Sequence, residues 1–174
     1  MNQLTLIIII LASMTTIAQH SIYNISLQSI DDKTIDLAQY QGKYILFVNV
    51  ASYCGYTNQY SDLQKLYERY DNLEVIGLPC NQFLFQEPFS KDSIKQFCES
   101  NYSITFLMTE KINVKGKNQH PLYKWLTNKK LNNLKDSSVK WNFQKYLIGI
   151  NGNLIDVFPS KTPPLSKDII QHLN

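Results

Sequence analysis

The chain has 174 residues, of which 44% are hydrophobic and 18% are charged, and its formal net charge is +3. This length and composition predict one globular domain with a sizeable core, and we find no low-complexity tract or internal repeat. Because Arg69 is the only arginine, bidentate phosphate recognition is poorly supplied, and nucleic-acid binding is not indicated.

The first residues form a segment apart from this domain. Leu4–Ala12 is an apolar run too short to span a bilayer, and Thr16-Ile17-Ala18 follows with small residues at the two positions that a signal peptidase reads. We predict a signal peptide over residues 1–18, cleaved after Ala18, and an exported domain over residues 19–174 that is periplasmic or secreted. The alternatives are an uncleaved anchor and a buried N-terminal strand, because no lysine or arginine precedes the apolar run.

Cysteine usage indicates redox chemistry. Cys54, Cys80 and Cys98 are the three cysteines, and no C-x-x-C is present. If two of them pair, one is left over, which in an exported protein suggests a redox role rather than a disulfide scaffold. We expect no metal and no bound cofactor.

The domain begins with a short β segment. Ile22–Leu27 and Thr34–Leu37 flank Asp31-Asp32-Lys33 and predict a small hairpin. Gly42 then breaks the chain before the next strand.

The most informative stretch is Tyr44–Thr57, which reads as a strand, a turn and the start of a helix. Tyr44–Ala51 is apolar with little polar alternation, as is typical of a central strand covered on both faces. Apolar residues at helical spacing predict a helix over Tyr60–Tyr70. Cys54 therefore lies just ahead of a helix N-terminus, where unpaired N–H groups and the helix dipole favour a thiolate. The alternative is a buried structural cysteine, but loops after central strands carry function more often than packing.

A second strand is predicted over Leu73–Leu78. The following loop, Pro79–Pro88, is dense in amide and aromatic side chains and has no regular period. Ligands of open α/β sheets bind beyond the carboxyl ends of strands, so we expect this loop and that of Cys54 to border one site.

Ser90 is a typical N-cap residue and predicts a helix from Lys91 to about Asn101. Cys98 follows Ile94 at i+4 and starts on the apolar face of this helix. From this pattern alone, Cys98 is interpreted as a small core residue.

The rest of the chain alternates short elements. The predictions are ambiguous segments at Ile104–Leu107 and Ile112–Val114, a helix over Pro121–Thr127, a solvated loop over Asn128–Lys140, a hairpin of Tyr146–Ile150 with Leu154–Phe158, and a helix over Leu165–Leu173. Strand–helix alternation followed by a hairpin and a helix predicts an α/β, thioredoxin-like fold, a central mixed β-sheet flanked by helices.

Three motifs now form one pattern. Asn49–Thr57 (NVASYCGYT) resembles the active-site signature of glutathione peroxidases, Pro79–Pro88 (PCNQFLFQEP) resembles their second motif, and Lys140–Phe143 (KWNF) resembles their third. The motifs match in order and spacing, and the resemblance runs from about Ile22 to the C-terminus. Residues 19–174 are therefore similar to one glutathione peroxidase domain of the cysteine-containing, thioredoxin-dependent or phospholipid-hydroperoxide type.

The resemblance implies a catalytic set of Cys54, Gln86, Trp141 and Asn142. A peroxide O–O bond needs a soft nucleophile, and attack by the Cys54 thiolate gives a sulfenic acid and releases an alcohol or water. The two side-chain amides and the indole N–H are donors for the sulfur and the leaving oxygen. Outside the resemblance, Trp141 reads as a core aromatic and each amide as a loop cap.

The resemblance further implies that Cys98 is a resolving cysteine. It attacks the Cys54 sulfenic acid, and a thioredoxin-type protein reduces the resulting disulfide. Because the predicted helix buries Cys98 away from Cys54, that helix must partly unwind. Cys80 is interpreted as a packing residue. Use of glutathione is the alternative, disfavoured by Cys98 and by the single arginine.

The chain departs from the family pattern at two positions. Phe89 stands where the family has glycine, and Leu107 stands where it has proline. A bulky Phe89 narrows the approach to the site or makes it more apolar, which affects the preferred hydroperoxide rather than the chemistry. Asn128–Val139 is short compared with the insertion of tetrameric members, so we expect a monomer with an open site that admits lipid hydroperoxides at a membrane as well as hydrogen peroxide. The lysines of this segment attract an acidic reductase or anionic headgroups, or simply form a solvated loop.

The preferred hypothesis is an exported, thioredoxin-dependent peroxidase that serves antioxidant defence and the response to oxidative stress. An alternative from another class is a thiol-based peroxide sensor that passes oxidation from Cys54 to a partner protein. A catalytically dead binding module is disfavoured by the intact Cys54, Gln86, Trp141 and Asn142.

Overall fold

A computed structural model describes residues 21–173 of the chain. The predicted signal peptide over residues 1–18, with its cleavage site after Ala18, lies outside the described residues. Within the described part, no helix combines the length and the apolar character that a membrane crossing requires.

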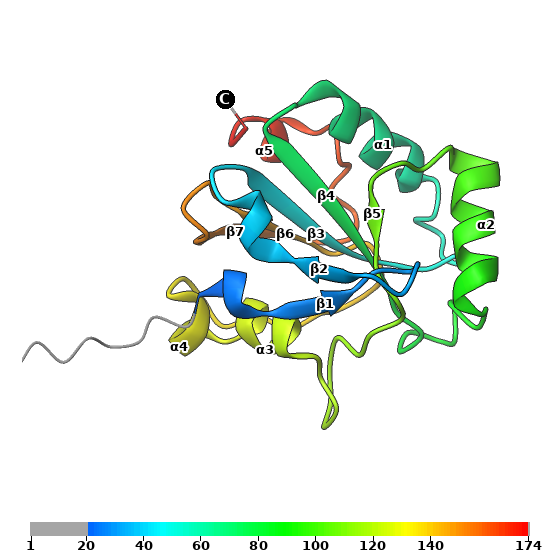
Figure 1. Cartoon of the computed structure of the whole chain (residues 1–174), viewed down its shortest axis with the longest axis horizontal. Helices are drawn as coiled ribbons and strands as arrows, with labels where there is room; N and C mark the ends of the chain where they lie inside the picture. Colours follow the sequence, from blue (N-terminus) through cyan, green and yellow to red (C-terminus); the bar gives the residue numbers. More distant parts are fainter. Residues whose placement is uncertain (1–20, 174) are drawn as a thin grey trace, which may run out of the picture.

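A five-stranded mixed sheet with the strand order β5-β4-β3-β6-β7 forms the centre of the domain (Figure 1). Its strands are β3 (Tyr44–Val50), β4 (Leu73–Pro79), β5 (Leu107–Met108), β6 (Lys145–Ile148) and β7 (Leu154–Phe158). β3 runs parallel to β4 and antiparallel to β6, and β6 and β7 form an antiparallel hairpin. This arrangement confirms the predicted α/β, thioredoxin-like fold.

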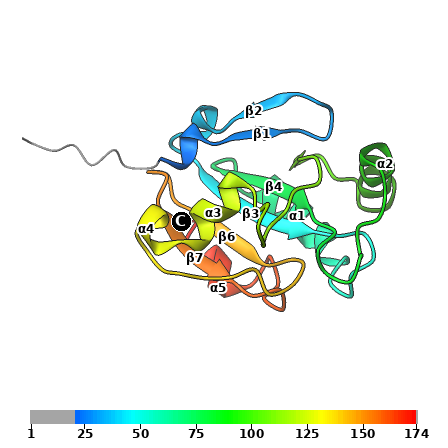
Figure 2. The ribbon, with the colours of Figure 1, turned by 90° about the horizontal axis from the view of Figure 1, so that it is seen from below.

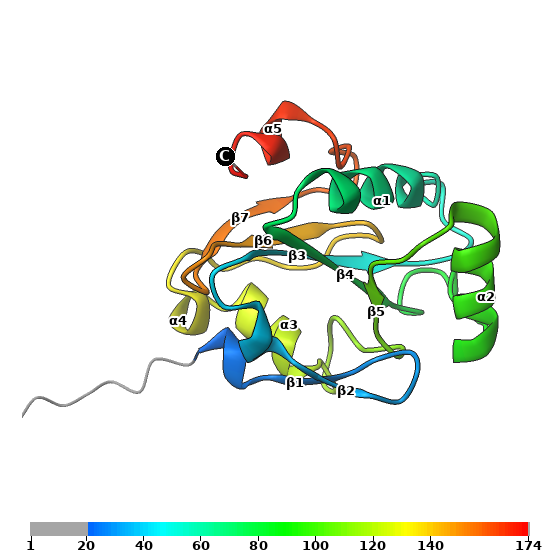
Figure 3. The same ribbon diagram turned by 45° about the horizontal axis from the view of Figure 1, so that its top comes forward.

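Helices and a small hairpin cover the sheet. They are β1 (Ser26–Gln28), β2 (Thr34–Asp36), α1 (Gln59–Arg69), α2 (Lys91–Tyr102), α3 (Pro121–Thr127), α4 (Lys129–Asn132) and α5 (Lys167–Ile170), with 3-10 turns at Ile22–Asn24 and Leu37–Tyr40. Figure 3 shows α1 and α5 on one side of the sheet and the β1–β2 hairpin with α3 on the other. Figure 2, seen from below, places α2 beyond the β5 edge, next to the turn of the hairpin.

β3 divides its side chains between two hydrophobic clusters, one on each face of the sheet. Leu46, Val48 and Val50 join residues of α1, α2 and α5. Ile45 and Phe47 join residues of the β1–β2 hairpin and α3. Because both faces are covered, the strand reads as a continuous apolar run, as predicted.

The strand register brings three loops to one end of the sheet, where β3 and β4 finish. Val50 pairs with Pro79 at the carboxyl ends of the parallel strands β3 and β4. Val48 pairs with Lys145, the first residue of the antiparallel strand β6. Three segments therefore meet at this end of the sheet: the one after β3, the one after β4 and the one before β6.

Two predicted elements differ from the structure near the chain ends. The start of the predicted first strand is a 3-10 turn, because the Ser21 side chain caps it by accepting the Tyr23 N–H at 3.2 Å. The predicted final helix over Leu165–Leu173 is helical only over Lys167–Ile170.

The segment Asn128–Lys140 is not simply a solvated loop, so that prediction was wrong in part. It contains α4, which Asn128 caps by accepting the Lys130 N–H at 2.9 Å. The Asn132 side chain is buried and donates to two carbonyls of α3. Asparagine side chains rather than apolar contacts organise this segment, and so it shows no hydrophobic period.

Candidate active site

Cys54 lies in a tight turn between β3 and α1. The helix α1 begins at Gln59, one residue before its predicted start at Tyr60, and Cys54 precedes it in the turn. The Thr57 hydroxyl holds the turn by accepting the Cys54 N–H at 3.0 Å, and it lies 2.9 Å from the Ala51 carbonyl. The Tyr56 N–H donates to Cys54 Sγ at 3.5 Å. A backbone donor of the turn, not of the helix, therefore faces the sulfur.

The loop after β4 is fastened to this β3–α1 turn by three hydrogen bonds. The Tyr53 N–H donates to the Gln86 carbonyl at 3.0 Å. Glu87 Oε2 accepts the N–H of Ser52 at 2.9 Å and its hydroxyl at 3.0 Å. The Glu87 N–H donates in turn to Asn81 Oδ1 at 2.9 Å. These bonds hold Gln86 beside the turn that carries the cysteine.

The segment before β6 completes the site. Asn142 is fully buried, and its Nδ2 donates to Gln86 Oε1 at 3.0 Å. Asn49 of β3 holds this segment through two hydrogen bonds. Its Nδ2 donates to the Trp141 carbonyl at 3.0 Å, and the Asn49 backbone carbonyl accepts the Phe143 N–H. Phe143 has a φ of 63°, in the left-handed region that only a firmly held non-glycine residue adopts.

The predicted catalytic set thus comes from three loops at one end of the sheet. Trp141 is half-buried and packs against the hydrophobic cluster that contains Cys54. Its ring also packs on Phe83, with ring centroids 5.6 Å apart. Amide and indole N–H groups stay protonated at pH 7, so they can stabilise negative charge on sulfur or on a leaving oxygen without giving up a proton.

Large apolar side chains lie next to the site residues in these loops. Leu84 and Phe85 have φ values of 51° and 53° and are 76% and 79% exposed. The Tyr53 ring lies 5.0 Å from the ring of Phe89. The departure from the family pattern at Phe89 therefore adds an aromatic contact directly beside the β3–α1 turn.

Cys98 belongs to the same hydrophobic cluster as Cys54 but is not bonded to it in this structure. It lies on α2, is 1% exposed, and no disulfide joins any of the cysteines. Burial raises the pKa of the Cys98 thiol to about 11; the Tyr60 hydroxyl lowers it, and the carboxylates of Glu87 and Glu99 raise it further. The thiol is thus kept protonated as long as α2 stays folded.

Cys80 belongs to the other face of the sheet. It is fully buried among the residues that pack under α3. Burial raises the pKa of its thiol above the ordinary value. These surroundings agree with its predicted role as a packing residue.

Glu87 is the functional-site residue to which the sequence analysis gave no role. Its side chain is fully buried, and Oε1 has no hydrogen-bond partner among the described residues. Burial raises the pKa of Glu87 to about 7, although the two hydrogen bonds from Ser52 and the charge of Lys111 lower it. Its place in the second motif was the available signal, but no local pattern shows that a glutamate in a loop is buried.

Lys145 is a second buried ionisable residue that the sequence did not indicate. Its Nζ donates to the carbonyls of Ser160 and Thr162, at 3.2 and 2.6 Å, and to Gln59 Oε1. Burial lowers the pKa of Lys145 to about 7. The side chain ties the segment after β7 to the first residue of α1, behind the candidate site.

Within residues 21–173, no group of three or more histidine, cysteine, aspartate or glutamate side chains could hold a metal ion. The chemistry argued below needs only a thiol and neutral hydrogen-bond donors.

Comparison with known proteins now identifies the family. The family model described as glutathione peroxidase matches residues 22–127. The chain is 41% identical to the glutathione peroxidase homolog BsaA of Bacillus subtilis over 157 residues, which cover 88% of this chain and 98% of that protein. It is 46% identical over 130 residues to the glutathione peroxidase-like peroxiredoxin HYR1 of Saccharomyces cerevisiae, with 74% of this chain and 80% of that protein covered.

A solved structure agrees with these relatives. The crystal structure of Trgpx in its apo form is 38% identical, and it superposes with a TM-score of 0.66 over 88% of this chain and 95% of that one. The matched family region includes the β3–α1 turn and the loop after β4, and the longer alignments extend it over most of the chain. The chain belongs to the glutathione peroxidase family and is a peroxidase, an oxidoreductase that acts on peroxides with a thiol as its reducing co-substrate.

Proposed function

We propose that Cys54 is the peroxidatic cysteine and that Gln86, Trp141 and Asn142 stabilise its transition state. The Cys54 thiolate attacks one oxygen of the hydroperoxide, the O–O bond breaks, and the other oxygen leaves as an alkoxide or hydroxide that takes up a proton. Cys54 becomes a sulfenic acid, and the peroxide is reduced by two electrons to an alcohol or water.

The observation that carries this assignment is the 3.0 Å hydrogen bond from Asn142 Nδ2 to Gln86 Oε1. This bond orients two amides that come from different loops, and the Tyr53–Gln86 bond sets one of them against the turn of Cys54. Fixed dipoles of this kind need no reorganisation when charge develops. A pair of loop-capping amides would instead bond to backbone groups of their own loops.

We propose further that Cys98 resolves the sulfenic acid. Its sulfur displaces the hydroxyl from Cys54, the Cys98 proton and that hydroxyl leave as water, and a Cys54–Cys98 disulfide forms. A dithiol protein of the thioredoxin type then reduces the disulfide and is itself oxidised. Cys98 lies in the same hydrophobic cluster as Cys54, on a 12-residue helix with two buried residues, and this placement supports the proposed role. Direct reduction by glutathione is the alternative.

The proposed substrates are hydrogen peroxide and organic hydroperoxides, including those of lipids. The exposed side chains of Leu84 and Phe85 beside Gln86 support an apolar substrate that makes transient contact at a membrane. We also propose that the protein is an exported monomer with a role in antioxidant defence, cleaved after Ala18.

Intact mass of the purified protein before and after one equivalent of hydrogen peroxide, with peptide mapping, tests this proposal. We expect a loss of two hydrogens, about 2 Da, that maps to a Cys54–Cys98 bridge. Oxygen addition at Cys54 without the bridge would contradict the role of Cys98 and favour glutathione or a partner protein as reductant. The same spectrum tests whether the mature chain begins at Gln19.

A further inference from the structure

The helix that carries Cys98 packs unevenly in the domain: Phe97 and Tyr102 are partly buried against the hydrophobic cluster that includes Tyr60, whereas a cavity lies on another side. Of the 12 residues of α2, only Ile94 and Cys98 are buried. A cavity of about 510 Å³ lies between α2, β5 and the β1–β2 hairpin, and Cys98, Asp31 and Lys95 all line it. On this side, close packing therefore contributes little to holding the helix against the domain.

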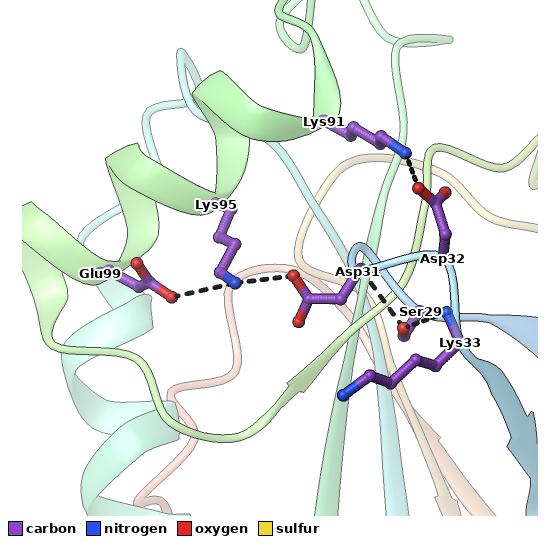
Figure 4. A network of polar contacts seen from close by, with 7 residues as sticks. All are labelled: Ser29, Asp31, Asp32, Lys33, Lys91, Lys95 and Glu99. Atoms are coloured by element: carbon purple, nitrogen blue, oxygen red, sulfur yellow. Dashed lines mark hydrogen bonds and ion pairs between the residues drawn. The ribbon is translucent and has the colours of Figure 1, made fainter.

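Ion pairs cross the space between the hairpin turn and α2 (Figure 4). Lys95 Nζ lies 2.6 Å from Asp31 Oδ1, and Lys91 pairs with Asp32. Lys91 and Lys95 are one helical turn apart and so present their charges from one face of α2. Glu99 also pairs with Lys95, at 3.8 Å, but it moves with the helix.

The hairpin turn presents its two carboxylates from a fixed backbone. Ser29 Oγ accepts the N–H groups of Asp31 and Lys33, at 3.3 and 3.0 Å. Asp32 adopts a φ of 61°, and the Ile30 N–H donates to the Met108 carbonyl at 2.9 Å. The turn is thus tied to the sheet through β5, and it does not depend on α2 for its shape.

Disulfide formation requires this arrangement to open. The Cα atoms of two bonded cysteines lie roughly 4.4–6.8 Å apart, and Cys98 in its folded helix is buried and unbonded. A segment that carries Cys98 to Cys54 must leave its place beside the cavity, and the charges of Lys91 and Lys95 must then leave Asp32 and Asp31.

We propose that Asp31 and Asp32 hold α2 in its closed position through their ion pairs with Lys91 and Lys95. The two aspartates are thus positioning residues for Cys98, and they slow formation of the Cys54–Cys98 disulfide. The inference rests on the proposed role of Cys98 as the resolving cysteine. Because these ion pairs are solvent-exposed, salt screens them, and the rate of the resolving step follows ionic strength.

The test is the double variant Asp31→Asn/Asp32→Asn. Asparagine keeps the size of both side chains and tolerates the left-handed conformation at position 32, so the turn is preserved. Asp62→Asn is the matched control, because Asp62 pairs with Lys65 on the surface of α1 at 3.2 Å and touches neither α2 nor the hairpin.

The rate of disulfide formation is measured in a single turnover, by rapid quenching with a thiol-alkylating reagent after one equivalent of hydrogen peroxide. We expect the double variant to form the disulfide roughly threefold to tenfold faster than the wild type at low salt, with the initial oxidation of Cys54 unchanged. Raising sodium chloride from about 0.05 M to about 0.5 M should accelerate the wild type and Asp62→Asn but not the double variant. An unchanged or slower rate in the double variant would overturn the proposal.

Hydrogen exchange of the α2 amides in the fully reduced protein gives a second readout that needs no peroxide. Exchange should be faster in the double variant and unchanged in Asp62→Asn, and equal exchange in all three proteins would overturn the proposed hold on α2. A different result would contradict the proposed role of Cys98 instead. In that result the wild type forms no Cys54–Cys98 bridge, although the α2 amides still exchange faster in the double variant than in the wild type.

Discussion

The proposed peroxidatic and resolving cysteines lie in regions built on opposite principles. The β3–α1 turn around Cys54 is held by the Thr57 hydroxyl and by bonds to the loop after β4, with Glu87 buried behind it. The helix of Cys98 has two buried side chains, a cavity on one side and exposed ion pairs across it.

This difference matches the two half-reactions. Peroxide reduction needs hydrogen-bond donors that are already aligned, and a loop cross-linked by buried bonds supplies them. Resolution needs one sulfur to travel to the other, and segments with few buried contacts open at a low free-energy cost. If the two regions serve different half-reactions, each can be changed independently of the other.

The largest expected effect is the loss of the nucleophile. Cys54→Ser should lower peroxide consumption by roughly 10³-fold or more, because a hydroxyl at this position is a far poorer nucleophile than a thiolate. Peroxide consumption with thioredoxin and thioredoxin reductase is the measurement. Cys80→Ala is the control, since that thiol packs on the other face of the sheet and should leave the rate within a few-fold of wild type. A Cys54→Ser enzyme that retained most activity would refute the site assignment.

Removing the proposed resolving cysteine should separate the two half-reactions. Cys98→Ser should reduce the first equivalent of peroxide at the wild-type rate but stop thioredoxin-driven turnover, because no disulfide forms. Stopped-flow oxidation of Cys54 and steady-state turnover are compared in the same preparation. Unimpaired cycling would show that the thioredoxin-type protein reduces Cys54 directly.

A change within the rigid region should affect the first half-reaction alone. Asn142→Ala deletes a donor and its bond to Gln86, and we expect the rate of Cys54 oxidation to fall by about 10²-fold. Asn132→Ala is the matched control, because Asn132 is also a buried asparagine but caps α3 far from the site. The control should lower the melting temperature and leave the oxidation rate near that of the wild type; a similar rate loss in both variants would indicate a general folding defect.

The sequence predicted the parts of the site that are local. The apolar run of β3, the turn with Cys54 and the amide-rich loop after β4 are contiguous patterns, and the structure places each as expected. The role of Asn142 and Gln86 came from the resemblance to a family, because two amides 56 positions apart carry no local signal.

What the sequence missed depends on tertiary contacts. The burial of Glu87 follows from its bonds to Ser52 on another strand end, and the burial of Lys145 follows from carbonyls after β7. The residues that flank Glu87 and Lys145 in the sequence do not distinguish either side chain from an exposed one. The hold of Asp31 and Asp32 on α2 likewise joins residues about 60 positions apart, and a hairpin turn with three charges reads as ordinary solvated surface.

The smallest expected effect is a change in pH dependence, and it compares two buried glutamates. Burial raises the pKa of Glu87 and of Glu74 to about 7, above the ordinary 4.5, so the folded protein holds more protons than the unfolded chain between these values. Each carboxyl therefore contributes stability that is present below pH 4.5 and lost as pH rises through 7, by an amount on the order of 2–3 kcal/mol. Glu87→Gln and Glu74→Gln should both flatten this loss in melting temperature measured against pH.

Only one of the two glutamates should alter chemistry. Glu74 pairs in register with Ile45 at the far end of the strands, whereas the Glu87 carboxylate adds to the rise in the pKa of Cys98 that burial causes. Glu87→Gln keeps an oxygen for Ser52 but removes the charge, so the Cys98 thiol should ionise more readily and the disulfide should form a few-fold faster near neutral pH. Glu74→Gln should leave that rate unchanged. If both variants accelerated resolution equally, the effect would come from general loosening of the fold, and the separation between a rigid peroxidatic region and a movable resolving helix would not hold.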